Sequence, residues 1–259
     1  MFGLSEFEIQ KFLLIFVRLA GMLVVIPFFG ERGAPVPLKL GLAFLLSVIV
    51  MPLVPGSAET LPAVSLFGFA VGLLQSLLAG LLIAFVPVLL FAGIQLGGEI
   101  SGFQMGFGIV SVIDPASQNR ISLIAQFDYL LAFLVFVSLD GHLYLLKGIV
   151  ESFRVLPLLG AHFPGSIGRS LLVFSSRMFV IGAKIAAPVL VTILLTNVGL
   201  GILARTMPQM NIFLVGFPLQ IGMGLITLGL SVPVFAYVFE KLFHSMLQSW
   251  MQMIAAFGG

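Results

Sequence analysis

Six long apolar runs constrain the fold of this chain more than any other feature of its sequence. Each has roughly the 20 residues that a helix needs to cross the hydrocarbon core of a bilayer. None alternates apolar and polar residues as a barrel strand does, and only 8% of the 259 residues are charged. The sequence therefore predicts an all-α, multi-pass integral membrane protein. The runs are Phe12–Phe29, Leu38–Val54, Phe67–Leu96, Leu123–Leu146, Leu171–Ala204 and Ile212–Phe239.

Several of these runs are longer than a bilayer requires. As one continuous helix, Leu171–Ala204 would extend about 51 Å, against a hydrocarbon core of about 30 Å. Prolines interrupt the long runs at Pro87, Pro188, Pro218 and Pro233, and proline inside a helix removes a backbone hydrogen bond and bends the axis. We therefore expect long, bent helices. They are either tilted in an ordinary multi-pass protein or extend beyond the bilayer within an assembly.

Between the third and fourth runs lies the sequence GGEISGFQMGFGIVSVIDPAS, which covers Gly97–Ser117. Gly98, Gly102 and Gly106 recur at every fourth residue in it. On a helix this spacing places all three on one face, where another backbone can approach closely. The three glycines are a predicted helix-packing seam.

An apolar loop follows this seam. Gly106 and its second neighbour Gly108 weaken continuation of the helix, and Asp114-Pro115 forms the predicted exit turn of the loop. Irregular apolar backbone at membrane depth must be buried in protein or line a cavity. Flexible methionines suit both core filling and a soft, adaptable seal. The candidate residues of the loop and its base are Met105, Phe107, Ile109, Val110, Val112 and Ile113.

The sequence shows no catalytic constellation. There is no cysteine, and none of the three histidines has a partner at i+4 for a zinc site. No basic run suggests nucleic acid. We therefore expect neither enzyme activity nor a metal, a cofactor or a nucleic-acid partner. Charged residues in or beside the apolar runs are predicted to pair, to reach the interface or to lie above the bilayer, and not to form a proton path: Arg18, Asp128, Asp140, Arg177 and Lys184.

Four stretches resemble the FliR family, the flagellar export-gate family whose injectisome counterpart is SctT. They occur in the family's order and span nearly the whole chain. The patterns G-E-x-x-G-x-Q-M-G…D-P-x-S and P-Q-x-x-I-F-x-x-G-F-P-L are specific in combination, and the second begins at Pro208-Gln209. The stretches are GERGAPVPLKLGLA at 30–43, GGEISGFQMGFGIVSVIDPAS at 97–117, DGHLYLL at 140–146 and MPQMNIFLVGFPLQI at 207–221.

The resemblance implies a pore-forming subunit of the bacterial flagellar type III protein export gate, in the flagellar basal body of the inner (cytoplasmic) membrane. Such a subunit joins FliP and FliQ subunits in a helical hetero-oligomer with FlhB attached, surrounded by membrane lipid, and passes unfolded export substrates. Residues 1–165 would be the FliP-like part, and residues 166–259 a FliQ-like hairpin that turns at Pro208-Gln209. The loop Phe107–Ile113 would be the closing plug, although the family often has phenylalanine where this chain has Ile109 or Val112.

A secondary transporter is the alternative from another functional class. Its binding site would lie near the midplane of the membrane and would be formed by broken helices. A transporter is expected to show two pseudo-repeated halves with paired broken helices. Here the halves differ, since the first has a glycine-rich loop and the second a bent hairpin. Purification in mild detergent distinguishes the two, because a gate subunit should retain several different membrane proteins.

Overall fold

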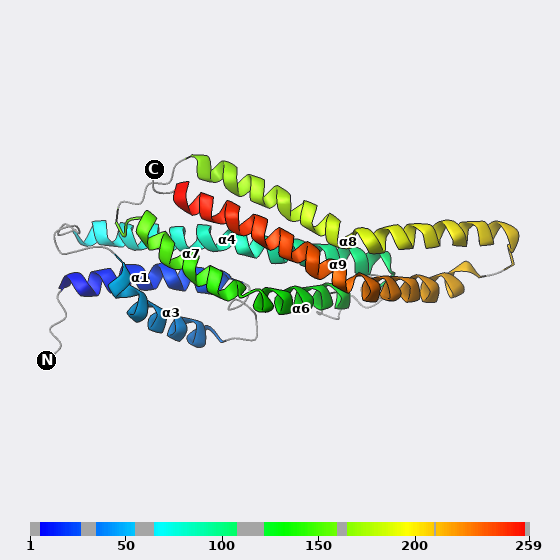
Figure 1. The fold of residues 1–259 in the computed structure, drawn as a ribbon, viewed down its shortest axis with the longest axis horizontal. Coiled ribbons are helices and arrows are strands. Elements are labelled where there is room, and N and C mark those ends of the chain that lie inside the picture. The colour runs from blue at the N-terminus through cyan, green and yellow to red at the C-terminus, as the bar shows by residue number, and fades with distance from the viewer. Residues whose placement is uncertain are drawn as a thin grey trace. The chain divides into compact units, whose positions relative to one another are not determined.

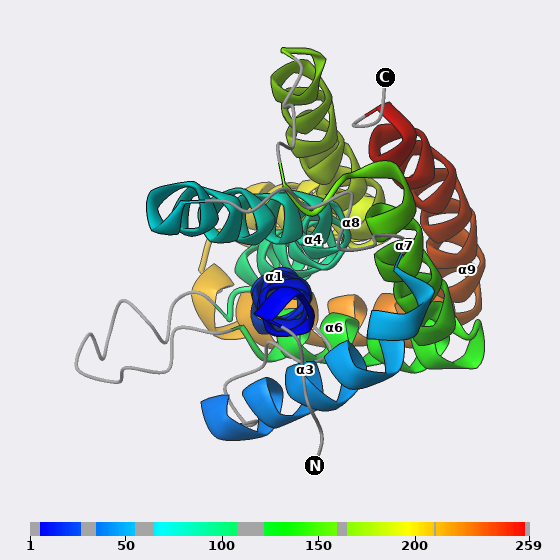
Figure 2. The same cartoon turned by 90° about the vertical axis from the view of Figure 1, so that its left-hand side faces the viewer.

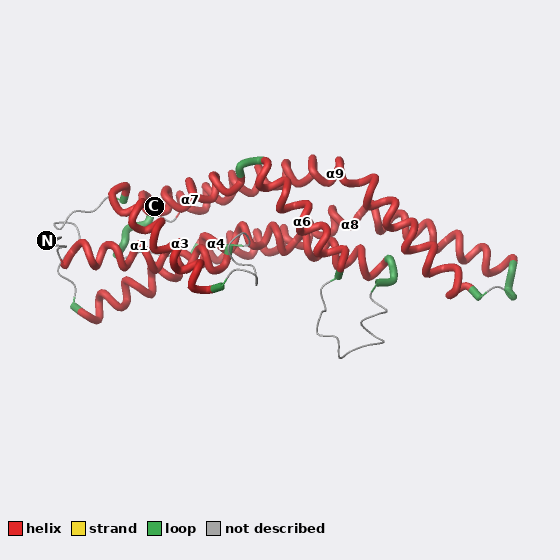
Figure 3. Tube along the Cα trace, turned by 90° about the horizontal axis from the view of Figure 1, so that it is seen from below, coloured by secondary structure: helices red, strands yellow, loops and turns green. Residues whose placement is uncertain are grey.

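A computed structural model describes residues 6–26, 35–54, 65–107, 122–159, 165–209 and 211–256. Within these ranges every regular element is a helix (Figure 3), which confirms the all-α prediction. The last helix continues beyond the predicted run Ile212–Phe239, through Trp250 to Ala256. The α-helices are labelled in Figure 1. The elements are α1 (Glu6–Val25), α3 (Val36–Val50), the 3-10 helix η1 (Met51–Leu53), α4 (Leu66–Gln104), α6 (Leu123–Ser138), α7 (Gly141–Val155), α8 (Ser166–Thr206) and α9 (Ile212–Ala256).

Four helical stretches of the described residues are long and apolar enough to cross a membrane: Val36–Leu53, α4, α8 and α9. The bent pair of α6 and α7 would make a fifth. The expectation of six spans is therefore too high for the described residues. The difference is α1, the helix at the run Phe12–Phe29, which does not meet the same criterion. It contains Glu6, Glu8, Lys11 and Arg18 within its 20 residues.

The predicted run Leu123–Leu146 is not one straight helix. It divides into α6 and α7, whose axes differ by 71°. Asp140 lies at the break with φ +54°, a left-handed conformation that aspartate adopts more readily than most residues. The backbone N–H of Leu139 still bonds to the oxygen of Val135, and that of Leu143 bonds to Asp140. Hydropathy records how apolar a run is, so it cannot reveal a change of direction within it.

The chain folds into two compact units, each assembled from separate segments. The first contains Met1–Leu89, Asp140–Phe174 and His244–Gly259. Here α1 and α3 lie side by side (Figure 2). The ring of Phe44 meets those of Phe12 and Phe16 edge-on, with centroids 5.2 Å and 6.4 Å away. These aromatic contacts, together with a bond of 2.8 Å from Lys11 Nζ to the oxygen of Val54, hold α3 and its continuation against α1.

Arg18 of α1 is fully buried in the first unit. Its guanidinium donates to the backbone oxygens of Ser152 at 3.3 Å, Leu156 at 3.2 Å and Pro157 at 3.0 Å. Carbonyls at the last turn of a helix lack helical donors and carry partial negative charge. Arg18 therefore caps the C-terminal end of α7 with two of its guanidinium nitrogens.

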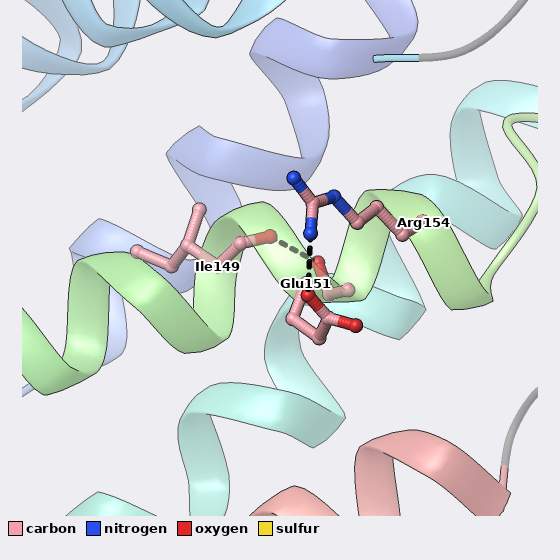
Figure 4. Close-up of polar contacts among 4 residues, drawn as sticks. Ile149, Glu151 and Arg154 are labelled. Atoms are coloured by element: carbon pink, nitrogen blue, oxygen red, sulfur yellow. Dashed lines mark hydrogen bonds and ion pairs between the residues drawn. The ribbon is translucent and has the colours of Figure 1, made fainter. Parts of the chain in front are cut away.

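The outer side of α7 carries a different kind of interaction. Arg154 Nη1 lies 3.4 Å from Glu151 Oε2, one helical turn earlier (Figure 4). Nearby, the Ser152 hydroxyl donates to the oxygen of Ile149 at 2.7 Å. Because both charged side chains are exposed, 62% and 36% respectively, such a pair contributes little to stability. The buried cap by Arg18, and not this ion pair, is what fixes the end of α7.

Trp250 is fully buried in the first unit, and it replaces a hydrogen bond that a proline removes from α4. Pro87 has no N–H, so the carbonyl of Ile83, four residues earlier, loses its helical donor. The indole Nε1 of Trp250 donates to this carbonyl at 2.8 Å. A Cβ on Gly148 of α7 would overlap the indole ring, so glycine makes the room. One side chain therefore joins α4, α7 and α9.

The second unit contains Leu90–Leu139 and Ser175–Phe243. Within it α8 and α9 run antiparallel and are joined at the turn that contains Pro208 and Gln209 (Figure 1). Two side-chain hydrogen bonds link the helices: Gln220 Nε2 donates to Asn197 Oδ1 at 2.6 Å, and Thr227 Oγ1 donates to Thr192 Oγ1 at 3.1 Å. The division into a FliP-like part over 1–165 and a FliQ-like part over 166–259 stays a prediction.

Candidate functional site

The C-terminal part of α4 approaches α8 through two glycines. A Cβ on Gly93 would lie 2.8 Å from the backbone oxygen of Met178. A Cβ on Gly97 would lie 2.9 Å from the backbone oxygen of Gly182. These distances are shorter than real Cβ contacts, so only glycine permits the two backbones to lie this close. Gly93 and Gly97 were not predicted as a packing seam, although they have the same i,i+4 spacing as Gly98 and Gly102.

Gly98 and Gly102 form a second row that faces α6. A Cβ on Gly98 would overlap the backbone of Ala125 and lie 3.0 Å from Asp128 Oδ2. A Cβ on Gly102 would overlap the hydroxyl of Ser122. The structure therefore brings these two predicted seam glycines against a helix of the same chain. Their role in contacts with other subunits stays a prediction.

Gly106 does not share this helical face, because α4 ends at Gln104. Its φ is +94°, in the left-handed region that glycine adopts without strain. The N–H of Gly106 bonds to the oxygen of Phe103 at 3.1 Å, and that of Phe107 bonds to the oxygen of Gly102 at 3.0 Å. This pair of bonds is a Schellman motif, which satisfies the last carbonyls of a helix. Gly106 is thus the residue that ends α4.

The turn after α4 is anchored in an apolar cluster. Met105 is fully buried together with Ile124 of α6, Val189 and Ile193 of α8, and Leu228 of α9. Phe107 is half-buried and packs against the same cluster. The first two predicted plug residues are therefore fixed in position by three helices, immediately before the apolar part of the loop.

Two residues of α9 shape the space around this turn. Atoms of the Met105 side chain occupy the volume that a Cβ on Gly224 would need. The ring of Phe217 lies beside Gly106, where an added Cβ would be 3.3 Å from its Cδ1. Neither α9 residue was predicted from the sequence, because contacts between segments more than 100 residues apart have no local pattern.

A groove of about 260 Å³ opens between α8 and α9, next to Phe217 and Gln220. Its polar groups are the two carboxamides that bond to each other across the hairpin. Within the described ranges no group of three or more histidine, aspartate and glutamate residues could hold a metal ion. The groove is lined by Asn197, Leu200, Gly201, Ala204, Gly216, Phe217 and Gln220.

The remaining predicted plug residues, Ile109, Val110, Val112 and Ile113, and the exit turn Asp114-Pro115 lie outside the described residues. Their roles stay predictions. Pro208 and Gln209 lie at the exposed turn between α8 and α9. The described part of the site is thus its base: a capped helix end, a buried methionine and a half-buried phenylalanine.

Comparisons with known proteins agree with the sequence patterns. The family model described as bacterial export proteins, family 1, matches residues 9–246. The flagellar biosynthetic protein FliR of Bacillus subtilis strain 168 is 34% identical to this chain, over 95% of both proteins. The proteins of the same name from Escherichia coli K12 and Aquifex aeolicus VF5 are 32% and 31% identical, over 88% and 98% of this chain and 86% and 97% of their own lengths. The resemblance is confirmed, and this chain belongs to the FliR family of bacterial export proteins.

Proposed function

We propose that this membrane protein is a pore-forming subunit of the flagellar type III protein export gate. It would lie in the bacterial inner membrane and pass unfolded flagellar subunits. Family membership supports a role in the flagellar export apparatus. The observation that carries the finer proposal is the base of the loop, where a capped helix end and two buried or half-buried side chains hold the start of the apolar sequence Phe107–Ile113.

In this proposal the apolar loop closes the pore when no substrate is present. Apolar side chains crowded into a constriction exclude water, and a dewetted constriction stops ions without any charge. The fixed base at Met105 supports this role, since a plug must start from a rigid point to return to the same position. Closure needs no bond to form or break, so the mechanism assigns no catalytic residue.

The lengths and surfaces of the last two helices support a role inside an assembly. At about 1.5 Å per residue, the 41 residues of α8 and the 45 residues of α9 extend about 61 Å and 67 Å, roughly twice the hydrocarbon core. Both expose large apolar side chains, for example Leu195 at 66% and Leu230 at 76%. We propose that FliP, FliQ and FlhB subunits cover part of these faces and that lipid covers the rest.

The transporter alternative has weaker support. Only α6 and α7 form a broken pair among the described helices, whereas α8 and α9 are each continuous. A midplane site of the transporter type requires paired discontinuous helices in the two halves. Mild-detergent purification tests this directly, because the proposed gate subunit should co-purify with FliP and FliQ and a transporter should not.

Deletion of Val110–Ile113 tests the plug. The complex should assemble and conduct ions in a planar bilayer, whereas the intact complex should stay closed. A variant of unchanged loop length, with Val110, Val112 and Ile113 replaced by serine, should leak too, because it removes only the apolar character. Replacing Ile109 and Val112 by phenylalanine should keep the seal. An assembled deletion complex that conducts no more than the intact one would show that the loop is not the plug.

A further inference from the structure

We propose that Gly224 of α9 is the residue that positions the end of α4, and with it the start of the plug segment. This inference rests on the proposed function in one respect, namely that the segment after Phe107 closes the pore. The geometric part, the contact between Gly224 and Met105, is independent of it. Any side chain at position 224 would overlap Met105 in its observed position.

The side chain of Met105 fits into a hole in α9 that exists because residue 224 has no side chain. A Cβ on Gly224 would lie 2.5 Å from Met105 Cγ, 2.6 Å from its Cε and 2.8 Å from its Sδ. Real Cβ atoms essentially never approach heavy atoms this closely. Three atoms along the side chain are involved, so rotating only its terminal methyl group would not relieve the overlap. The side chain of Met105 would have to rotate about χ1 or χ2 into another rotamer, or the residue would have to shift.

Met105 has little freedom to move elsewhere. It is 0% exposed, and the buried side chains of Ile124, Val189, Ile193 and Leu228 surround it. Interiors of this kind are close-packed, so displacing one member strains the others. Its backbone N–H also donates a hydrogen bond to the backbone oxygen of Ser101 at 3.0 Å. A displacement would therefore be relieved toward the less buried side, which is the turn at Gly106 and Phe107.

A second contact places the same face of α9 against this turn. Phe217 precedes Gly224 by seven residues, which is two helical turns and returns to nearly the same face. Its ring lies beside Gly106, the residue of positive φ that ends α4. One helix, α9, therefore contacts the end of α4 twice: through the ring of Phe217 and through the space beside Gly224 that Met105 occupies. A shift of α9 along its axis would move both contacts, and with them the start of the plug segment.

The experiment compares glycine-to-alanine substitutions on one helix in the assembled complex. Gly224→Ala should displace Met105, whereas Gly222→Ala is the matched control, because no atom lies within 4 Å of its added Cβ. Combining Gly224→Ala with Met105→Ala removes the three overlapping atoms, so Gly224→Ala should have no further effect in the Met105→Ala background. Met105→Ala alone reports the separate cost of the cavity.

The first readout does not depend on the plug hypothesis. The natural chain has no cysteine, so Phe107→Cys introduces a single thiol on this subunit, and its reaction with a polar maleimide reports how exposed position 107 is. Combined with Phe107→Cys, Gly224→Ala should accelerate labelling roughly tenfold, as expected for an overpacked site that opens. Gly222→Ala should leave the rate within about twofold of the parent, as is usual for surface changes. In the Met105→Ala background, adding Gly224→Ala should not accelerate labelling further.

The second readout is ion conductance per assembled complex, measured without Phe107→Cys. Gly224→Ala should conduct while Gly222→Ala stays closed, and in the Met105→Ala background Gly224→Ala should add no conductance. A labelling rate that Gly224→Ala does not change overturns the positioning role. Faster labelling without a leak, when the Val110–Ile113 deletion does leak, overturns the coupling to closure. If that deletion itself does not leak, the proposed function fails. Faster labelling by Gly224→Ala that is absent in the Met105→Ala background would still support the positioning of the turn by Gly224.

Discussion

Replacing Trp250 by phenylalanine tests the account of how the first unit tolerates Pro87. The indole is fully buried and its N–H lies 2.8 Å from the oxygen of Ile83, the carbonyl that Pro87 deprives of its helical donor. Phenylalanine keeps an aromatic ring and removes the donor. A buried carbonyl left without a partner costs about 1–3 kcal/mol. Loss of the larger ring adds a packing term next to Gly148, which must be separated from it.

A double-mutant cycle with Pro87→Ala makes this separation. Alanine restores an N–H at position 87, so the helix itself can satisfy the oxygen of Ile83. Trp250→Phe should then lose only the packing term, and its cost should fall by about 1–2 kcal/mol relative to the natural background. Stability can be followed by the helical circular dichroism of the purified protein as SDS is titrated into mild-detergent micelles.

An equal cost of Trp250→Phe in both backgrounds would contradict the proposed role of the indole N–H. Equal costs would mean that the indole N–H contributes nothing specific to the freed carbonyl and that Trp250 acts only by filling space. Gly148→Ala gives a second test, because its Cβ would overlap the indole and push the ring, with its N–H, away from the oxygen of Ile83. Its cost should therefore also fall when Pro87→Ala is present.

Two further substitutions test the ends of α7 and α4 by thermal unfolding in detergent. Arg18→Gln should lower the free energy of unfolding by about 3 kcal/mol or more, because the carbonyls that end α7 lose a buried charged donor. As a control, Lys147→Gln on the exposed side of α7 should change the free energy of unfolding by less than about 0.5 kcal/mol. Similar effects of the two substitutions would contradict the capping role of Arg18. Gly106→Ala should cost about 1–2 kcal/mol, because alanine is strained at a φ of +94°. Gly168→Ala in α8, with open space around the added Cβ, should cost nothing, and a Gly106→Ala protein as stable as this control would argue against the helix-ending role.

Much of the fold could be predicted from the sequence because apolar length is a local property. The apolar runs over 67–96, 171–204 and 212–239 became α4, α8 and α9. The helices α4 and α8 extend beyond their runs at both ends, whereas α9 extends beyond its run only at the C-terminal end. Charged and turn-forming positions were less predictable. The helix α1 contains four charged residues and is not among the apolar spans of the described residues. The left-handed Asp140 divides the apolar run Leu123–Leu146 into two helices.

The candidate site was predicted only in part, for a similar reason. The spacing of Gly98 and Gly102 indicated a close-packed face, but it could not say that α6 of the same chain occupies that face. Spacing also placed Gly106 on the helix, whereas its role is to end the helix in a left-handed turn. Gly93 and Gly97 carry the same i,i+4 spacing and were not predicted, and Gly224 gave no separate signal among the 29 glycines of the chain.

Apolar length and short ordered motifs are properties of neighbouring residues, so the sequence is enough to identify a helical membrane protein of the FliR family. It is not enough to show that Trp250 satisfies the carbonyl freed by Pro87 or that Met105 occupies the space beside Gly224. These pairs are separated by more than 100 residues. Their contact depends on which helix faces meet, and only the packed chain fixes that.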